Sequence, residues 1–149
     1  MTARVGFCCK YLHPDQTMKP KLLEEIQRPL TEKCTTVAWL NRQTVNEAEQ
    51  RLYDIMHHNM QSAYNLVEYV GNLKPGLCMC RLGSNQLPMY TQPDWRYFWQ
   101  QKDIRDELAK GYARVGELAR QLDVRLSFHP GQFTVLASDN EDIVERSIE

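Results

Sequence analysis

The chain has 149 residues, of which 42% are hydrophobic and 25% are charged, and its formal net charge is −1. Such a length and composition are those of one ordinary globular domain. The near-neutral charge excludes a protein that binds nucleic acid through a broad basic surface, so any such contact must be local. The sequence contains no apolar run long enough to cross a membrane and no signal-peptide pattern at its N-terminus.

The first predicted element is a short apolar β-strand from Val5 to Cys9, which ends at Lys10. A polar segment with prolines at positions 14, 20 and 29 follows and extends to about Gln43. Within this polar segment, Lys21 to Gln27 could form a short helix. The remainder predicts an irregular loop.

A long helix is predicted next. Thr44 and Glu47 have the spacing of a capping box, in which each residue satisfies the backbone N–H of the other. Apolar residues then recur with a helical period from Val45 to about Val70, with one gap at Asn59. The Gly-Asn pair that follows ends the helix.

The second half of the chain predicts two further strands, each with a helix after it. Leu77 to Leu82 is an apolar strand, and the aromatic-rich connector from Tyr90 to Trp99 is typical of a surface loop. Apolar residues spaced three and four apart predict an amphipathic helix from about Lys102 to Leu122. Val124 to Phe128 is the third strand. A second capping box at Ser138-Asp139-Asn140-Glu141 then predicts a last helix.

Strand and helix thus alternate three times, which is typical of parallel βα units. The strands are continuous apolar runs, as expected for a sheet that is covered on both faces. A doubly wound sheet and a (β/α)8 barrel both fit, but no Gly-rich phosphate loop follows the first strand, which argues against a Rossmann half. The strands deliver Lys10, Arg81 and His129 at their ends, and in a barrel these ends share the rim where active sites are built.

A complete barrel needs about 250 residues and eight strands, whereas this sequence predicts three strands. We therefore expect residues 1–149 to be the N-terminal part of a (β/α)8 barrel, about its first three βα units, cut within a helix. A separate chain that supplies the C-terminal half, a frameshift or a partial sequence would each explain this length.

The chain has five cysteines: Cys8, Cys9, Cys34, Cys78 and Cys80. Their spacing lacks the C-x2-C pairs of a zinc site. Because four of them lie in predicted strands, we expect those four to be small buried hydrophobic residues. Free cysteines of this kind indicate a reducing compartment, so we expect a cytoplasmic protein, or one in the host cytoplasm if a phage encodes it.

The third strand leads directly into His129-Pro130-Gly131-Gln132-Phe133. A histidine at the end of a strand is held at the rim of the sheet, where it can bind a metal or transfer a proton near neutral pH. The glycine lets the backbone turn sharply, which presents Gln132 and Phe133 outward. A purely structural histidine is the alternative.

Three sequence blocks together resemble the UV damage endonuclease (UvdE) family: Arg4 to Cys9, Arg81 to Pro88, and Arg125 to Phe133. Val144 to Ser147 continues the last match, so the resemblance covers most of the chain. The H-P-G-Q block is specific in this context, although endonuclease IV-type barrels also carry H-P-G. The resemblance implies a metal-dependent barrel enzyme that cuts the DNA backbone immediately 5′ of UV photoproducts. The expected cofactor is a divalent metal, typically Mn²⁺, with Mg²⁺ or Zn²⁺ as alternatives.

By position, the resemblance makes His129 a metal ligand, and it makes Gln132 and Phe133 the pair that wedges into the duplex at the lesion. Metal ions stabilise charge on a phosphate and supply hydroxide near neutral pH. An aromatic ring between base steps costs roughly a few kcal/mol of unstacking, and the cost is least where damage has already weakened pairing. Damaged DNA could therefore be selected without reading its sequence.

The sequence departs from the family pattern at three positions. Phe7 and Phe133 stand where some members have Tyr, so stacking is retained without the hydroxyl group. Asn85 stands where some relatives have His close to the metal. It is either a weaker oxygen ligand or a turn residue after Gly83.

Other candidate residues have a structural alternative. Arg81 would clamp a phosphate or hold a carboxylate of the barrel in place. Lys10 and Tyr11 would contact DNA or be solvated loop residues. No residue of the chain is assigned a catalytic role.

His57 and His58, in the middle of the long helix, predict a solvent-facing pair. Trp39, Trp95 and Trp99 would stack on bases or pack loops against the barrel.

The leading hypothesis is a DNA repair endonuclease whose substrate is UV-damaged double-stranded DNA, with this chain alone incomplete and inactive. A second is another barrel, such as an endonuclease IV-like abasic-site nuclease or a sugar isomerase. A third is a catalytically dead DNA-binding fragment, although the net charge counts against tight binding. Three parallel strands leave an unpaired edge, so we also expect the isolated chain to fold poorly.

Overall fold

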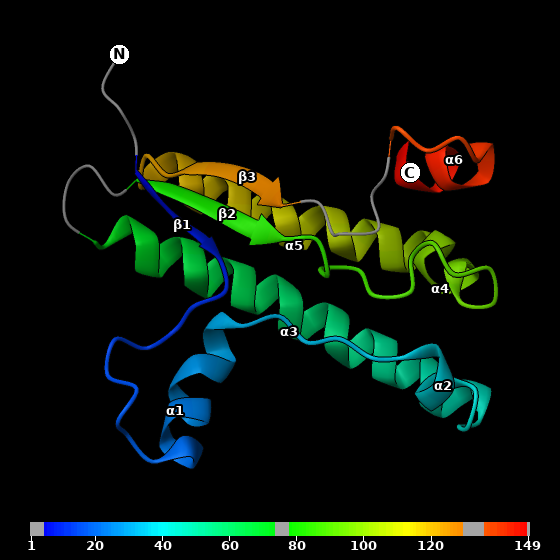
Figure 1. Cartoon of the computed structure of the whole chain (residues 1–149), viewed down its shortest axis with the longest axis horizontal. Helices are drawn as coiled ribbons and strands as arrows, with labels where there is room; N and C mark the ends of the chain where they lie inside the picture. The colour runs from blue at the N-terminus through cyan, green and yellow to red at the C-terminus, as the bar shows by residue number, and fades with distance from the viewer. Residues whose placement is uncertain (1–4, 74–77, 130–135, 149) are drawn as a thin grey trace.

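The computed structural model describes residues 5–73, 78–129 and 136–148, which contain a three-stranded parallel sheet (Figure 1). The strands are β1 (Gly6–Cys9), β2 (Met79–Gly83) and β3 (Arg125–His129). They lie in the order β1-β2-β3, so each strand pairs with the next one along the chain. The three predicted strands are therefore confirmed to within two residues at each end.

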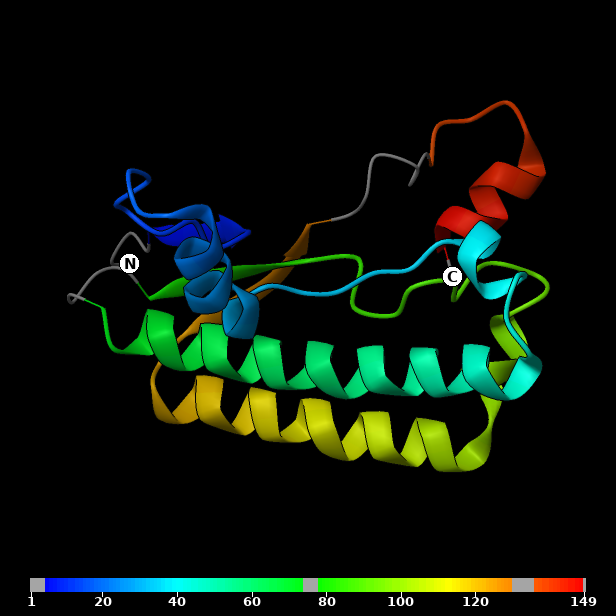
Figure 2. The ribbon, with the colours of Figure 1, turned by 90° about the horizontal axis from the view of Figure 1, so that it is seen from below.

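The helices include two long ones that lie side by side along one face of the sheet, α3 and α5 (Figures 1 and 2). The helical elements are α1 (Pro20–Gln27), the 3₁₀ turn η1 (Arg28–Leu30), α2 (Val37–Leu40), α3 (Val45–Gly71), α4 (Arg96–Gln100), α5 (Lys102–Gln121) and α6 (Glu141–Ile148). Each long helix connects two neighbouring parallel strands, which is the βαβ arrangement that the sequence predicts. Among the described residues, no helix combines the length and the apolar character needed to cross a lipid bilayer.

Helix α3 begins at the predicted capping box. The Thr44 hydroxyl accepts from the Glu47 N–H at 3.3 Å, and a Glu47 carboxylate oxygen accepts from the Thr44 N–H at 3.0 Å. The helix ends at Gly71, where the N–H of Asn72 still donates to the carbonyl of Glu68. Both ends of the longest element are thus set by local side-chain and backbone hydrogen bonds.

The buried apolar residues form two clusters. One fills the space between β2 and the two long helices: Val67, Val70, Cys80, Leu82, Val115 and Ala119 belong to it. The other joins α2, the first half of α3 and α4: Leu40, Leu52, Met56, Trp95, Phe98 and Trp99 belong to it. The helical apolar periods read from the sequence correspond to these clusters, because positions three and four apart share one helix face.

The two faces of the sheet differ. Cys80 and Leu82 are buried against the helices, so the residues that alternate with them, Arg81 and Gly83, face the other way. The prediction that both faces of every strand are covered is wrong for β3, where Phe128 is 57% exposed. β3 pairs with β2 alone among the described strands, so less of the structure packs against it.

The connector from Tyr90 to Trp99 is not the surface loop that its composition predicts. Trp95, Phe98 and Trp99 are buried, and the chain enters α4 at Arg96. The indole N–H of Trp99 donates to the carbonyl of Pro88 at 3.0 Å, and that of Trp95 donates to the Asn41 side-chain oxygen at 2.9 Å. The aromatic residues therefore anchor the connector in the second cluster, because burying them outweighs the loop tendency of Pro93.

Trp39 behaves differently from the other two tryptophans. It is 37% exposed on α2, and the Arg51 guanidinium lies 5.6 Å above its ring. Packing is thus confirmed for Trp95 and Trp99, whereas Trp39 retains an accessible edge.

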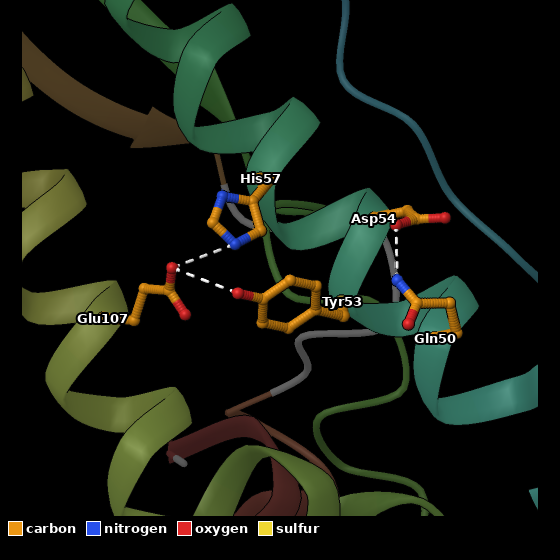
Figure 3. Close-up of polar contacts among 5 residues, drawn as sticks. All are labelled: Gln50, Tyr53, Asp54, His57 and Glu107. Atoms are coloured by element: carbon orange, nitrogen blue, oxygen red, sulfur yellow. Dashed lines mark hydrogen bonds and ion pairs between the residues drawn. The ribbon is translucent and has the colours of Figure 1, made fainter. Parts of the chain in front are cut away.

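The two central histidines of α3 are partly buried rather than fully solvent-facing as predicted, and the His57 side chain is 43% exposed. His57 turns toward α5, where its Nε2 lies 3.0 Å from a carboxylate oxygen of Glu107, and the Tyr53 hydroxyl donates to that oxygen at 3.3 Å (Figure 3). Nε2 of His58 hydrogen-bonds to the carbonyl oxygen of Thr31 at 2.9 Å. Both imidazoles therefore join α3 to other parts of the fold, which the helical period alone did not indicate.

The N-terminal cap of α6 lies two residues later than predicted. The side-chain oxygen of Asn140 accepts from the N–H of Asp142 at 3.0 Å. The backbone carbonyl of Asn140 accepts from the N–H groups of Ile143 and Val144. Ser138 instead accepts from the N–H of Asn140. Asn and Ser are equally good N-cap residues, so Ser138 and Asn140 were both candidates, and Asn140 is the one that caps α6.

The cysteine prediction is confirmed for Cys80, which is buried, but Cys78 precedes β2 and is half-buried. Cys34 is exposed. The side chains of Cys8 and Cys9 lie outside the described residues.

Candidate functional site

The carboxyl ends of the strands meet at one edge of the sheet. β1 pairs with β2 up to Cys9 and Leu82, and β2 pairs with β3 up to Gly83 and His129. Lys10, directly after β1, follows at the same edge. The prediction that Lys10 and His129 share a rim is therefore supported by the strand register. We call this edge the strand-end site.

Arg81 lies two residues before the end of β2, whereas the sequence placed it at the strand end. β2 continues to Gly83, and Arg81 pairs with Cys8 on one side and Ser127 on the other. Its half-buried side chain shares the helix-free face of the sheet with His129. This position suits a residue that holds a neighbouring group in place better than one that reaches out to a DNA phosphate.

His129 is the exposed last residue of β3. Gln132 and Phe133, predicted to insert into the duplex, lie outside the described residues, and so does the side chain of Phe7. Their assigned roles remain predictions.

Tyr11 is not a solvated or DNA-contacting loop residue. Its side chain is 5% exposed and packs edge-on against Tyr69, with ring centroids 5.0 Å apart. Burial raises the pKa of the Tyr11 hydroxyl, and the neighbouring Tyr69 raises it further. Lys10, the residue before it, is exposed and borders a shallow groove against α1, which also includes Arg28 and Lys33.

A carboxylate that the sequence analysis did not single out also lies at the strand-end site. Glu32 comes from the polar segment, and a Cβ atom placed on Gly83 would lie 2.5 Å from Oε1 of this residue. Its Oε2 accepts from the Gln86 amide at 2.7 Å, and the Asn85 side chain hydrogen-bonds to the same carboxylate. Burial raises the pKa of the Glu32 carboxyl, and the two amides offset part of that effect.

A buried asparagine organises the polar groups around Glu32. Asn59 of α3 has no exposed surface, and its side-chain oxygen accepts from the Lys33 N–H at 2.7 Å. Its amide nitrogen donates to the carbonyls of Lys33, Asn85 and Gln86 at 3.0, 3.3 and 3.1 Å. The polar segment and the loop after β2 are therefore held together by one side chain.

A tyrosine from α5 completes this arrangement. The hydroxyl of Tyr112 donates to the side-chain oxygen of Gln86 at 2.9 Å. Burial raises the pKa of Tyr112 strongly, and the charge of Glu32 adds to the effect, so the hydroxyl stays protonated. We refer to these connected residues as the Asn59 network: Glu32, Lys33, Asn59, Asn85, Gln86 and Tyr112.

The described residues contain no group of three or more His, Cys, Asp or Glu side chains that could hold a metal ion. The donors at the strand-end site are the His129 imidazole, the Glu32 carboxylate and the Asn85 amide. Asn85 is exposed on the loop after β2, where it hydrogen-bonds to Glu32, so its role as a turn residue is evident and its role as a ligand is untested.

Parallel βα units with donor groups at the strand ends define the class of α/β proteins that build active sites at the carboxyl edge of the sheet. The family model described as UV-endonuclease UvdE matches residues 5–149. The chain belongs to this family.

Individual relatives agree with the family match. The UV DNA damage endonucleases of Bacillus anthracis (strain A0248) and Bacillus cereus (strain 03BB102) are each 27% identical to this chain over 116 residues, which are 78% of the chain and 34% of each relative. The chain therefore spans about a third of the length of these curated relatives. The crystal structure of SacUVDE matches with a TM-score of 0.67 and 23% identity, over 97% of this chain and 41% of that chain, and this likeness supports the fold.

Removing the Asn59 side chain should destabilise the protein. Asn59→Ala leaves the buried carbonyl of Gln86 and the partly buried backbone groups of Lys33 without this partner, and we expect a loss of about 3 kcal/mol in the free energy of unfolding. Gln61→Ala is the matched control, because Gln61 is exposed on the same helix and its amide donates to the exposed Asn65 side chain one turn on. It should cost less than about 0.5 kcal/mol. Urea denaturation measures both, and equal losses would contradict the role given to Asn59.

His58 should make stability depend on pH. Burial lowers its pKa from the ordinary value of 6.5, and the charges of Lys33 and Arg28 lower it further, against the opposite effect of the Thr31 hydrogen bond. The folded state therefore favours the neutral ring, and this contribution is complete above pH 6.5 and is lost as the pH falls through the lowered folded value. Between about pH 7.5 and about pH 5, the free energy of unfolding measured in urea should fall less for His58→Gln than for the wild type. An unchanged pH dependence in the variant would count against this assignment.

Proposed function

We propose that the chain is the N-terminal part of a (β/α)8-barrel DNA repair endonuclease that nicks the phosphodiester backbone 5′ of UV photoproducts with the help of divalent metal ions. The family match over residues 5–149 carries the proposal. Because the chain spans about a third of its relatives, the activity belongs to a longer protein.

The arrangement of the sheet is compatible with a barrel. The long helices α3 and α5 lie on the same face of the three strands (Figure 2). A barrel places all of its helices outside, but one half of a doubly wound sheet also carries its helices on one face, so the choice of a barrel depends on the family match. The face that carries Arg81 and His129 would then be the barrel interior, and the strand-end site would be part of its catalytic rim.

The strand-end site offers the first donors for a metal ion. His129 would bind it through an imidazole nitrogen, with Asn85 as a weaker oxygen donor. Mn²⁺ accepts nitrogen and oxygen ligands of this kind, with Mg²⁺ or Zn²⁺ as alternatives. When bound, the ion would stabilise negative charge on the phosphate and supply hydroxide near neutral pH.

Lesion recognition is assigned to the residues after Gly131. Gln132 and Phe133 would insert into UV-damaged double-stranded DNA, where weakened base pairing lowers the cost of unstacking. Phe7 within β1 and Lys10 directly after it would contact the same DNA. The net charge of −1 means that the chain contributes little general attraction to DNA.

The activity can be tested on damaged plasmid. The protein encoded by the longest reading frame that contains these 149 residues is stripped of metal, supplied with Mn²⁺, and mixed with UV-irradiated, abasic and intact supercoiled DNA. We expect nicking of the irradiated plasmid that EDTA abolishes, and no nicking by the 149-residue chain alone. Cutting of the abasic plasmid alone would indicate an abasic-site nuclease instead. Irradiated DNA that stays intact would refute the proposal.

The role of His129 has its own test in the same assay. His129→Ala should lower the rate of nicking by at least about 100-fold, because it removes a ligand of the metal on which the reaction depends. His57→Gln is the control, since it changes an imidazole at the contact between α3 and α5, and it should retain most activity. Similar rates for the two variants would remove His129 from the metal site.

A further inference from the structure

We propose that Glu32 is a direct ligand of the divalent cation at the strand-end site, beside His129. The inference rests on the proposed function, in which a metal binds at this edge. It adds a ligand from the polar segment between β1 and α2, rather than from a strand of the sheet.

The position of the carboxylate carries the argument. Gly83 and His129 are register partners on neighbouring parallel strands, so positions 83 and 129 project from the same face of the sheet. Oε1 of Glu32 lies within 2.5 Å of the point that a Gly83 Cβ would occupy. The carboxylate thus fills the place of the missing side chain, next to the position from which the imidazole emerges.

Among the described residues, no ion pair compensates the charge of Glu32. Its hydrogen-bond partners are the neutral amides of Asn85 and Gln86. A half-buried carboxylate has lost hydration and is normally compensated by a cation or a metal ion. A divalent ion at the strand-end site would supply this compensation, and carboxylate and imidazole are both ligands that Mn²⁺ accepts.

The Asn59 network orients the carboxylate. Gln86 donates to Oε2, and Asn59 and Tyr112 in turn fix Gln86. Groups that hold a ligand in this way are typical of metal sites, where they set the direction of the coordinating atom. Oε1 is the carboxylate oxygen nearer to Gly83.

Two variants test Glu32 in different ways. Glu32→Gln removes the negative charge and keeps the shape. Gly83→Ala keeps the charge but places a methyl group where Oε1 lies, and the flexible end of Glu32 can move aside without a shift of the backbone. Glu25→Gln is the matched control, because it removes an exposed carboxylate from the nearby helix α1.

The measurement is a titration of the metal-free protein from the nicking assay with MnCl₂, followed by the EPR signal of free Mn²⁺. We expect Glu32→Gln and Gly83→Ala to weaken binding at one site by at least about tenfold, and Glu25→Gln to bind as the wild type does. Mn²⁺ should also raise the melting temperature of the wild type and of Glu25→Gln more than that of Glu32→Gln. Circular dichroism confirms that each variant is folded.

The outcomes separate this inference from the proposed function. If the wild type nicks irradiated DNA and binds Mn²⁺, but both site variants bind it equally well, Glu32 is a structural residue and the inference fails alone. A change in the melting temperature without any change in Mn²⁺ affinity leads to the same conclusion. A wild type that neither binds Mn²⁺ nor nicks DNA overturns both.

Discussion

The four hydrogen bonds of the Asn59 side chain are the constraint on which the strand-end site depends. They join two segments far apart in sequence, the polar segment before α2 and the loop after β2, to the middle of the longest helix. A buried amide whose oxygen and nitrogen are both hydrogen-bonded fixes the geometry of its partners far more strictly than apolar packing does. The position of Glu32 over Gly83 follows from this arrangement, since the residue next to Glu32 is held by both of its backbone groups.

The sheet and its helices provide the frame for that arrangement. Parallel strands in sequential order bring their carboxyl ends to one edge, and the two long helices cover one face. The other face carries the half-buried Arg81, Gly83 and His129, the residue that ends β3. Functional groups can gather there because apolar packing is completed on the helical side.

Much of this fold could be predicted from the sequence, because its strongest signals are local. The Thr44–Glu47 capping box and the apolar periods of α3 and α5 gave helix bounds that differ from the structure by one residue or less at each end. The three strands and their parallel order followed from the alternation of elements. In each case, neighbouring residues determine the outcome.

The features that the sequence did not reveal depend on partners far away in the chain. Asn59 interrupts the apolar period of α3, and nothing near it in sequence shows that it binds two distant segments. The sequence around Tyr11 predicts a loop residue, because its packing partner Tyr69 is far away in the chain. Glu32 resembles the other acidic residues of the polar segment, and its importance appears only once Gly83 provides the space that the carboxylate fills. A list of strand-end residues therefore identified His129 but could not include Glu32.

The sequential parallel order also has a consequence for how the protein folds. Pairing of β1 with β2 closes a loop that contains the whole of α3, and pairing of β2 with β3 closes a loop that contains α5. Helices form from local contacts within microseconds, whereas pairing between distant strands must first overcome the entropy of closing a long loop. The edge that brings Lys10, Gly83 and His129 together is accordingly expected to assemble late, on helices that have already formed.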